Sequence, residues 1–425
     1  MRRYCDPPAA AAATIAVWAA CAGWTAPAVL VPPACAGQSP PGSIVFVESV
    51  PIETDLDLPE LPDAAGVWLD LIEGAAQTLD VFSFYFSPNP DGVCRLQPVL
   101  AEVQERARAG VAVRLLSDRK FHATYPQTHD RLGEVAGITA RLLDAERLWG
   151  GILHAKGMLI DRERFFLGSQ NWDWRALEHI HEFGAVVAHD ELAADLGRIV
   201  DLDWALAGGE PPPPRRSQVP ATPRWEPARR LTLPDGRVCE AVLAASPPQA
   251  LPESISWDLP LLVDQIDRAE IRVRLQLLSY NPGDRDGGWW PDLDAALRRA
   301  ALRGCDVQIL LSNWAKRASM LPHIQSLAVL PGIEIRFVNL PEWSGGFVPY
   351  ARTVHAKYLT CDDRALWLGT GNGSHGDFHR SRNISLFLRG DGCAEAADQF
   401  FTRSWTSAYA ETVDPCGHYT PPRRE

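Results

Sequence analysis

The stretch "LHAKGMLIDRERFFLGSQNWDW" (residues 153–174) decides how the fold of this chain is interpreted. His154 and Lys156 stand two residues apart, Asp161 follows five residues after the lysine, and after six more residues comes Gly-Ser-x-Asn. The same spacing returns in "VHAKYLTCDDRALWLGTGNGS" (residues 354–374). Because the whole element recurs without an internal insertion, the sequence predicts a duplicated architecture.

Each copy reads as an apolar strand that carries two polar side chains. A single His-x-Lys would fit an edge histidine beside a lysine that extends its amine to solvent. In an extended strand, however, residues two apart project from the same face, so His154 lies beside Lys156 and His355 beside Lys357. If two halves pack about a pseudo-twofold axis, these faces meet in one site with two imidazoles, two ammonium groups and two carboxamides.

The segments around the two copies support two equivalent halves. Helix-like runs carry apolar residues at helical spacing, and short apolar runs rich in branched residues read as strands. Alternating strands and helices predict an α/β layered fold in each half, with a largely parallel core sheet. The predicted order is helix 64–77, strand 78–86, helix 96–110 and strand 111–118, then helix 258–269, strand 270–280, helix 291–304 and strand 305–313.

Composition shifts predict the domain boundaries. A basic start, a long uncharged apolar run and small residues before position 37 are typical of a secretory signal, with a membrane or lipid anchor as the alternative. Residues 208–230 are rich in Pro and Arg, as in an extended linker. We therefore predict a signal peptide over 1–36, one half over 43–207, the linker, and the other half over 231–415, in an exported protein.

Bulk composition narrows the class of protein. The chain has 425 residues, 46% of them hydrophobic, which suits a globular protein with a sizeable core rather than a disordered one. The formal net charge of −12 argues against a protein that coats long nucleic acids through a basic face. Six cysteines follow the signal and permit disulfides, with Cys393 and Cys416 as the first pair to test.

The constellation of side chains suggests chemistry on phosphate. Lysine and asparagine side chains hold phosphate oxygens by charge and hydrogen bonding, and Ser169 and Thr370 would add hydroxyl donors. Two histidines on opposite sides of phosphorus allow double displacement through a phosphohistidine, with one attacking and the other moving the proton. The lysine charges would do what a metal ion does elsewhere, so neither a metal nor another cofactor is expected.

The two motifs, H-x-K-x4-D-x6-G-[ST]-x-N, resemble the phospholipase D superfamily at every motif position. Stretches such as "IVFVESVP", "GSQNWDWRALEHIHEFGAVV", "AVLAASPP" and "HAKYLT" look like its lysosomal branch, the third and fourth mammalian members. The resemblance implies two α/β/α-layered halves packed about a pseudo-twofold axis with the site between them. It implies these roles: His154 and His355 as nucleophile and acid/base, Lys156, Lys357, Asn171 and Asn372 as phosphate ligands, and Asp161 and Asp362 as structural residues, which we expect in ion pairs.

The resemblance also draws attention to Glu182, which lies 28 residues after His154, where the family often has a glutamate that orients an imidazole. The matching position after His355 is Asn383, which accepts a hydrogen bond but does not support an imidazolium by charge. On this ground we expect His154 to be the nucleophile.

Other interpretations are weaker. His122, His129, His179 and His181 suggest a metal site, but without a carboxylate cluster we expect solvated surface histidines. A serine hydrolase elbow and a nucleotide-binding loop do not fit "GTGNGSHG". A catalytically silent binding module of the same fold is the alternative to an enzyme. Both motifs are intact, which favours catalysis.

The sequence leaves the substrate open. The resemblance implies either a 5′ exonuclease of single-stranded nucleic acid or a hydrolase or transferase of phospholipid, the latter with membrane-surface contact. Tryptophans that would stack bases or touch acyl chains, or else belong to the core, are Trp172, Trp174, Trp289, Trp290 and Trp343.

Overall fold

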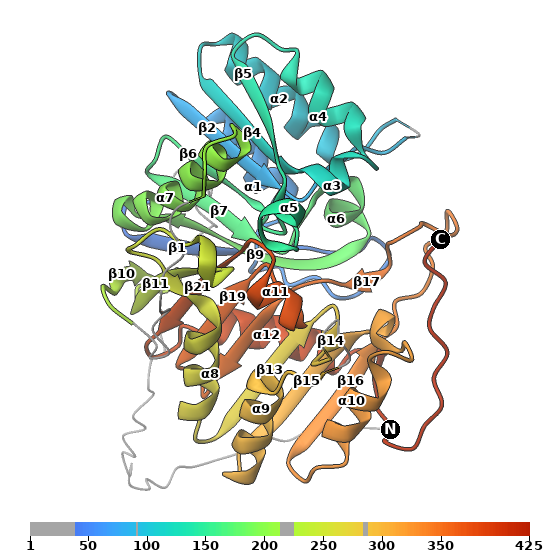
Figure 1. The fold of residues 1–425 in the computed structure, drawn as a ribbon. Coiled ribbons are helices and arrows are strands. Elements are labelled where there is room, and N and C mark those ends of the chain that lie inside the picture. Colours follow the sequence, from blue (N-terminus) through green and yellow to red (C-terminus); the bar gives the residue numbers. More distant parts are fainter. Residues whose placement is uncertain (1–38, 91, 213–224, 284–287) are drawn as a thin grey trace, which may run out of the picture. The chain divides into compact units, whose positions relative to one another are not determined.

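The computed structural model describes residues 39–90, 92–212, 225–283 and 288–425. The predicted signal peptide and residues 213–224 of the predicted linker lie outside them. In the first half, shown from blue to green in Figure 1, the helices and strands alternate as the sequence predicts. Its elements are β1 (Ser43–Ser49), α1 (Ala64–Glu73), β2 (Thr78–Ser83), β3 (Phe86–Ser87), α2 (Leu96–Arg108), β4 (Ala112–Asp118), α3 (Arg119–His122), α4 (Pro126–Gly133), β5 (Ile138–Leu143), α5 (Ala145–Trp149), β6 (Gly157–Ile160), β7 (Arg164–Gly168), β8 (Trp172–Asp173), α6 (Trp174–Glu178), β9 (Ile180–Ala188) and α7 (Asp190–Ala207).

The second half repeats this order, from yellow to red in Figure 1. Its elements are β10 (Arg229–Thr232), β11 (Val238–Ser246), η2 (Pro248–Ala250), β12 (Ser256–Trp257), α8 (Asp258–Arg268), β13 (Arg272–Leu277), β14 (Tyr280–Asn281), α9 (Asp292–Leu302), β15 (Asp306–Ser312), η3 (Asn313–Ala315), α10 (Leu321–Ala328), β16 (Ile333–Val338), β17 (Thr353–Val354), β18 (Tyr358–Cys361), β19 (Ala365–Gly369), β20 (Gly373–Ser374), α11 (His375–His379), β21 (Asn383–Arg389), α12 (Glu395–Trp405) and β22 (Ala410–Thr412).

The two sheets have the same strand order. The first runs β5-β4-β2-β6-β7-β9-β1, and the second runs β16-β15-β13-β18-β19-β21-β11. At one edge, β10 pairs with β11 and, through one residue, with β1, which links the sheets. The predicted duplication is therefore present in the topology, strand by strand.

The expectation of a largely parallel sheet is wrong. In the first half only β2, β4 and β5 are parallel, because helices connect them, whereas β6, β7, β9 and β1 are antiparallel. The antiparallel strands β6 and β7 are joined by a tight turn in which Asp161 and Arg162 have φ of 50° and 61°, and Asp362 and Asp363 repeat it between β18 and β19 with 52° and 59°. Such turns form hairpins and so return the chain antiparallel to itself.

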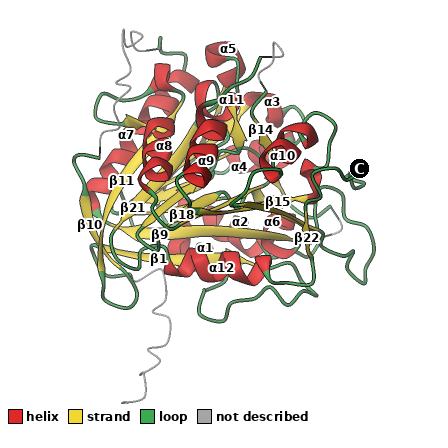
Figure 2. Ribbon diagram, turned by 90° about the horizontal axis from the view of Figure 1, so that it is seen from below, coloured by secondary structure: helices red, strands yellow, loops and turns green. Residues whose placement is uncertain are grey.

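Helices cover both faces of each sheet. Figure 2 shows α7 on the side of the strands opposite to α1 and α2, and α12 on the side opposite to α8 and α9. One apolar cluster lies between the first sheet and α1 and α2, and another between the second sheet and α8 and α9. The largest cluster joins residues of both sheets with α7 and α12, so the halves share a core.

The motif histidines and lysines do not lie within strands, contrary to the sequence prediction. Strands β6 and β18 begin only at Gly157 and Tyr358, just after each lysine. Ahead of them, Leu153 bridges Arg382 and Val354 pairs with His181, so each motif segment reaches into the other half. Tertiary pairing across the halves thus replaces the continuous strand that the apolar pattern suggested.

Two remaining features are the state of the cysteines and the character of the helices. The six cysteines in the described ranges are all free thiols; Cys393 is buried and Cys416 exposed, so the pair we singled out is not bonded here. Of the helices in the described ranges, none has both the length and the apolar character needed to cross a membrane.

Candidate active site

The two motif histidines meet where each half pairs with the other. The backbone N–H of His154 donates to the carbonyl of Arg382 at 2.9 Å, and that of His355 donates to the carbonyl of His181 at 2.9 Å. Only 8% and 7% of the two side chains are exposed. The charges of both motif lysines act on both imidazoles, so the motifs form one site.

The motif lysines are fully buried, and each ammonium donates to the carbonyl of the histidine two residues before it. Burial lowers the pKa of Lys156 well below its usual value, and the charge of Lys357 lowers it further. Burial also lowers the pKa of Lys357 to about 7, against the opposing effect of Glu182 and Asp377. An incoming phosphate would offset this burial of positive charge, which makes the site a preorganised place for an anion.

The groups that orient the imidazoles come from the opposite half, which overturns the ground on which the sequence favoured His154 as the nucleophile. Glu182 places both carboxylate oxygens 2.8 Å from Nδ1 of His355, not His154. Asn383 places Oδ1 3.1 Å from Nδ1 of His154. Because each motif segment pairs with the other half, at His181 of β9 or at Arg382 just before β21, the next residue along the chain reaches the histidine of the other half.

The carboxamide of Asn383 is fixed in one orientation. Its Oδ1 accepts from Oγ1 of Thr370 at 2.9 Å, and its Nδ2 donates to the carbonyl of Asp377 at 2.9 Å. Nδ1 of His154 is therefore the protonated nitrogen, and Nε2 keeps its lone pair. Burial and the two lysines lower the pKa of His154 well below its usual value, so this imidazole is neutral at neutral pH.

The pair of Glu182 and His355 differs from the pair of Asn383 and His154 in the number of protons that it retains. Burial raises the pKa of Glu182 to about 8, while Lys357 and Ser169 lower it, and burial lowers the pKa of His355. At neutral pH the two groups together retain a proton that the His154 pair lacks. Loss of a proton from Nε2 of His355 is then compensated through Nδ1 by the carboxyl.

Ser169 and Thr370 do not serve as free phosphate donors, contrary to expectation. The hydroxyl of Ser169 donates to the carbonyl of Phe183 at 3.2 Å and accepts from its N–H at 3.1 Å. The Thr370 hydroxyl donates to Asn383 and accepts from the N–H of Ile384 at 3.1 Å. Both hydroxyls are thus used to fix the strand that carries the orienting residue.

The motif asparagines are positioned for a ligand. Asn171 and Asn372 come just before β8 and β20, each of which pairs with a short strand, β3 or β14. In the described part of the chain, neither buried Oδ1 atom has a hydrogen-bond partner. Phosphate oxygens accept hydrogen bonds, so the Nδ2 groups of these side chains are the atoms that would donate to a bound phosphate, while each Oδ1 stays an acceptor.

The motif aspartates are structural, but not through the ion pairs we expected. Asp161 accepts from the N–H groups of residues 76, 77 and 78 at 2.7–2.8 Å. Asp362 accepts from those of residues 270, 271 and 272 at 2.7–2.9 Å. Each carboxylate therefore ties its hairpin turn to the start of the neighbouring strand, far from the imidazoles along β6 and β18.

We expected the histidines considered for a metal to be solvated surface residues, and in the structure they are not. His129, His179 and His181 are buried, and His122 is half-buried. His122, His129 and Asp130 place ligand atoms within 4.8 Å of one another, and Nε2 of His122 lies 2.7 Å from Oδ1 of Asp130. His179, just after α6, lies against Trp343, whereas His181, on β9, lies against Phe400.

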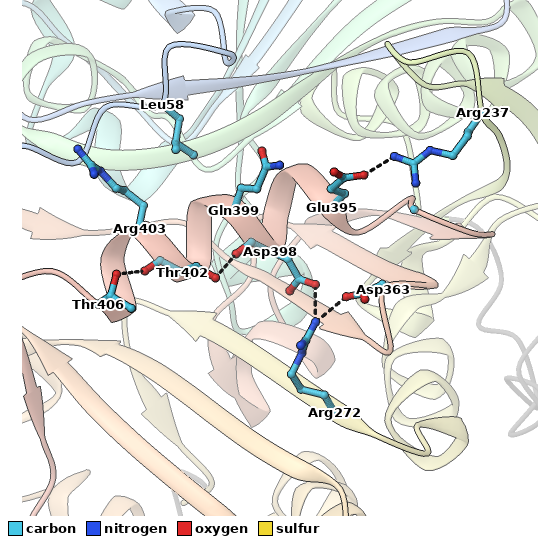
Figure 3. Close-up of a pocket in the computed structure, with 11 residues that line it drawn as sticks. Leu58, Arg237, Arg272, Asp363, Glu395, Asp398, Gln399, Thr402, Arg403 and Thr406 are labelled. Atoms are coloured by element: carbon cyan, nitrogen blue, oxygen red, sulfur yellow. Dashed lines mark hydrogen bonds and ion pairs between the residues drawn. The ribbon is translucent and has the colours of Figure 1, made fainter. Parts of the chain in front are cut away.

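The tryptophans divide between core and surface. Trp172 is fully buried against Trp68, and Trp290 is 5% exposed, so both are core residues. Trp174 and Trp343 are half-buried, and Trp289 is 57% exposed. A cavity of about 680 Å³ beside α12, drawn in Figure 3, is lined by paired charges such as Arg272 with Asp398, and contains none of the motif residues.

Sequence reasoning missed Asp118, Asp377 and Arg382. Asp118, at the end of β4, accepts from the N–H of Leu153 at 2.7 Å, and burial raises its pKa to about 6. Arg382, fully buried, is bonded twice to Asp203 of α7 and precedes Asn383. The sequence did offer a signal for Arg382: Arg382 and Asn383 occupy the positions in the second half that His181 and Glu182 occupy in the first.

Comparisons with known proteins agree with this geometry. The family described as "Cardiolipin synthase, PLD-like domain" matches residues 68–204 and 262–405, so both halves are covered. The chain belongs to the phospholipase D superfamily. The human protein named 5'-3' exonuclease PLD3 is 31% identical over 408 residues, which cover 88% of this chain and 81% of the relative. With both motifs intact and this relationship, the chain is a phosphodiesterase of the superfamily.

More distant relatives extend the comparison. The virion nicking-joining enzyme of vaccinia virus is 28% identical over 382 residues, covering 86% of this chain and 88% of that one. Phosphatidylserine synthase of Haemophilus influenzae superposes with a TM-score of 0.60 at 12% identity and covers 87% of both chains. At this identity the second likeness concerns the fold, which is the predicted arrangement of two α/β halves.

Proposed function

We propose that this protein hydrolyses phosphodiesters through a phosphohistidine on His154, with His355 as the acid and base. The observation that carries the proposal is the unequal support of the two imidazoles. His154, against Asn383, is neutral and offers the lone pair of Nε2, whereas His355 and Glu182 together retain a proton, because burial raises the pKa of Glu182 to about 8. Pairs of groups whose surroundings push their pKa values apart divide into nucleophile and acid in this way.

In the first step, Nε2 of His154 attacks phosphorus and the bond to the leaving oxygen breaks as that oxygen takes a proton from Nε2 of His355. In the second, His355 removes a proton from water, the water oxygen attacks phosphorus, and the bond to His154 breaks. The products are an alcohol and a phosphomonoester. Lys156, Lys357, Asn171 and Asn372 hold the non-bridging oxygens throughout.

The substrate class we propose is an unpaired end of nucleic acid. The human and vaccinia relatives bear names that refer to exonuclease and nicking-joining activities. The formal net charge of −12 favours short ends over long polymers. We also propose that the chain is exported by its N-terminal leader, which sequencing of the mature N-terminus would test.

Trapping the covalent intermediate tests the division of labour. A nitrophenyl phosphodiester has a good leaving group that needs no acid. In the His355→Ala variant the adduct should therefore form on His154 and then persist, because no group activates water. His154→Ala forms no adduct. Peptide mass spectrometry places the acid-labile phosphoryl group. A phosphoryl group on His355 in the His154 variant would reverse the assignment.

A substrate panel tests the class. The purified protein is assayed, with EDTA present, on 5′-hydroxyl and 5′-phosphate oligonucleotides and on phosphatidylcholine. We expect cleavage of oligonucleotides that chelator does not reduce, because lysines neutralise the phosphate. Turnover that is lost with EDTA and restored by magnesium or zinc contradicts the metal-free mechanism, and turnover of phosphatidylcholine alone contradicts the substrate class.

A further inference from the structure

Aromatic side chains gather on the His154 side of the site. The ring of Phe84 lies 5.1 Å from that of His154, edge to face, and 3.8 Å from that of Phe121. Tyr85 stacks on Phe121 at 6.0 Å and on Tyr125 at 4.9 Å. These four residues, Phe84, Tyr85, Phe121 and Tyr125, form a continuous surface of rings that leads away from the nucleophile, which we call the aromatic wall.

Buried polar groups hold the aromatic wall in place. The hydroxyl of Tyr85 donates to Oδ2 of Asp173 at 2.8 Å, and Arg175 clamps the same carboxylate. The ammonium of Lys156 lies 5.3 Å from the centre of the Phe84 ring, which links the aromatic wall to the phosphate ligands. Phe84 is 8% exposed, while Phe121 and Tyr125 are half-buried, so the outer rings reach solvent.

Within the described ranges, the second half has no counterpart of the aromatic wall. By the register of β2 with β13 and β4 with β15, Phe84 and Phe121 correspond to Leu278 and Ala315, and Tyr125, just before α4, corresponds to Met320, just before α10. Across the described residues, no ring contact reaches His355. The aromatic wall is therefore a departure from the pseudo-twofold symmetry, placed only beside His154.

We propose that the aromatic wall stacks an unpaired nucleobase, namely that of the nucleoside that stays on phosphorus in the phosphohistidine. The proposal rests on the proposed function. The leaving oxygen must face His355, in line with and opposite to Nε2 of His154. The leaving nucleoside therefore lies on the side of phosphorus that points away from the aromatic wall. The retained nucleoside is attached through an equatorial oxygen of phosphorus, so it is not carried toward His355 and has a path past His154 to the aromatic wall. A base stacks on aromatic rings with little regard to its identity.

The test couples a variant to an abasic substrate. Phe121→Leu keeps an apolar side chain but removes the ring, and Phe121→Trp keeps a ring. Each is assayed with oligonucleotides that carry one abasic residue on either side of the scissile phosphate, and the product shows which side keeps the phosphate. We expect Phe121→Leu to lower kcat/KM about 5- to 100-fold, the range for one stacked base, and Phe121→Trp to retain most activity.

The decisive result is coupling. When the retained nucleoside is abasic, Phe121→Leu loses nothing further, whereas an abasic leaving nucleoside leaves the loss intact. Met320→Leu, the control in the second half, shows no dependence on either base, and melting temperatures check folding. Equal losses on all substrates, or coupling to the leaving base, would overturn the proposal. Absence of oligonucleotide cleavage by the unaltered protein would instead overturn the proposed substrate.

Discussion

At the scale of single residues, the two halves differ most at the positions that orient the imidazoles. A carboxyl faces His355 and a carboxamide faces His154, although the motifs themselves match. A carboxyl that is hydrogen-bonded to Nδ1 orients the ring and supports its charged form, which suits a histidine that must act first as acid and then as base, as in other carboxylate–histidine pairs. An amide fixes the tautomer without adding charge, which suits a nucleophile.

Replacing each orienting group in turn should shift a different limb of the pH profile of kcat/KM. Glu182→Gln removes the carboxyl whose pKa is about 8, so His355 loses its proton at lower pH and the alkaline limb moves to lower pH. Activity should fall about 10- to 100-fold, as for other orienting groups. Asn383→Asp favours the imidazolium of His154, so the acidic limb should move to higher pH. Profiles of kcat/KM check both shifts, and unchanged limbs would show that these residues only pack.

At the scale of elements, a tight turn fixes the hairpin that follows each motif. The N–H of residue 163 donates to the carbonyl of residue 160, and that of residue 364 to residue 361, across two residues of positive φ. Aspartate tolerates the left-handed region better than most residues. Its side chain also accepts three backbone N–H groups of the neighbouring strand, so one residue type meets both requirements.

Asp161→Ala should therefore destabilise the fold rather than the chemistry. The change removes the acceptor and strains a residue at φ of 50°, which together should lower the free energy of unfolding by about 2 to 4 kcal/mol. Asp161→Asn, which keeps an acceptor and the turn preference, should cost less. Urea denaturation gives the values, with Glu163→Ala, exposed in the same turn, as the control. If both Asp161 variants were as stable as the Glu163→Ala control, this role would be refuted.

At the scale of the whole molecule, equivalent contacts between the halves carry different chemistry. Arg382, just before β21, is hydrogen-bonded to Asp203 of α7 at 2.8 Å, with further hydrogen bonds to the carbonyls of Ser246 and Ala250 at 2.7 and 2.6 Å. The corresponding contact between His181 and Ser404 is a neutral one at 3.2 Å. The charged contact lies next to Asn383, and the neutral one lies next to Glu182.

Removing one partner of each contact should show how much each contact contributes to the free energy of unfolding. Asp203→Ala leaves a fully buried guanidinium without its carboxylate, which should lower the free energy of unfolding by about 3 to 5 kcal/mol. Ser404→Ala removes a neutral hydrogen bond and should cost about 1 kcal/mol. Thermal and urea unfolding provide the comparison. A similar small cost for both variants would mean that the charged contact does not hold the halves together.

The sequence by itself determined the duplication, the order of elements and the identity of both motifs. These follow from local signals: periodic apolar residues, turn residues and fixed spacing, each of which acts within one segment of chain. The aspartate turns were visible as motif residues, although their acceptance of backbone N–H groups was not, because it depends on which strand lies alongside.

Only the tertiary structure decided how the halves divide the chemistry. The sequence placed Glu182 after His154, and proximity along the chain suggested the wrong partner. The structure pairs each motif segment with a strand of the other half, so Glu182 reaches His355 and Asn383 reaches His154. The burial that lowers the pKa values of both lysines and of His154 likewise arises only when the two halves close over the motifs, since solvation is a property of the packed molecule and not of the segment.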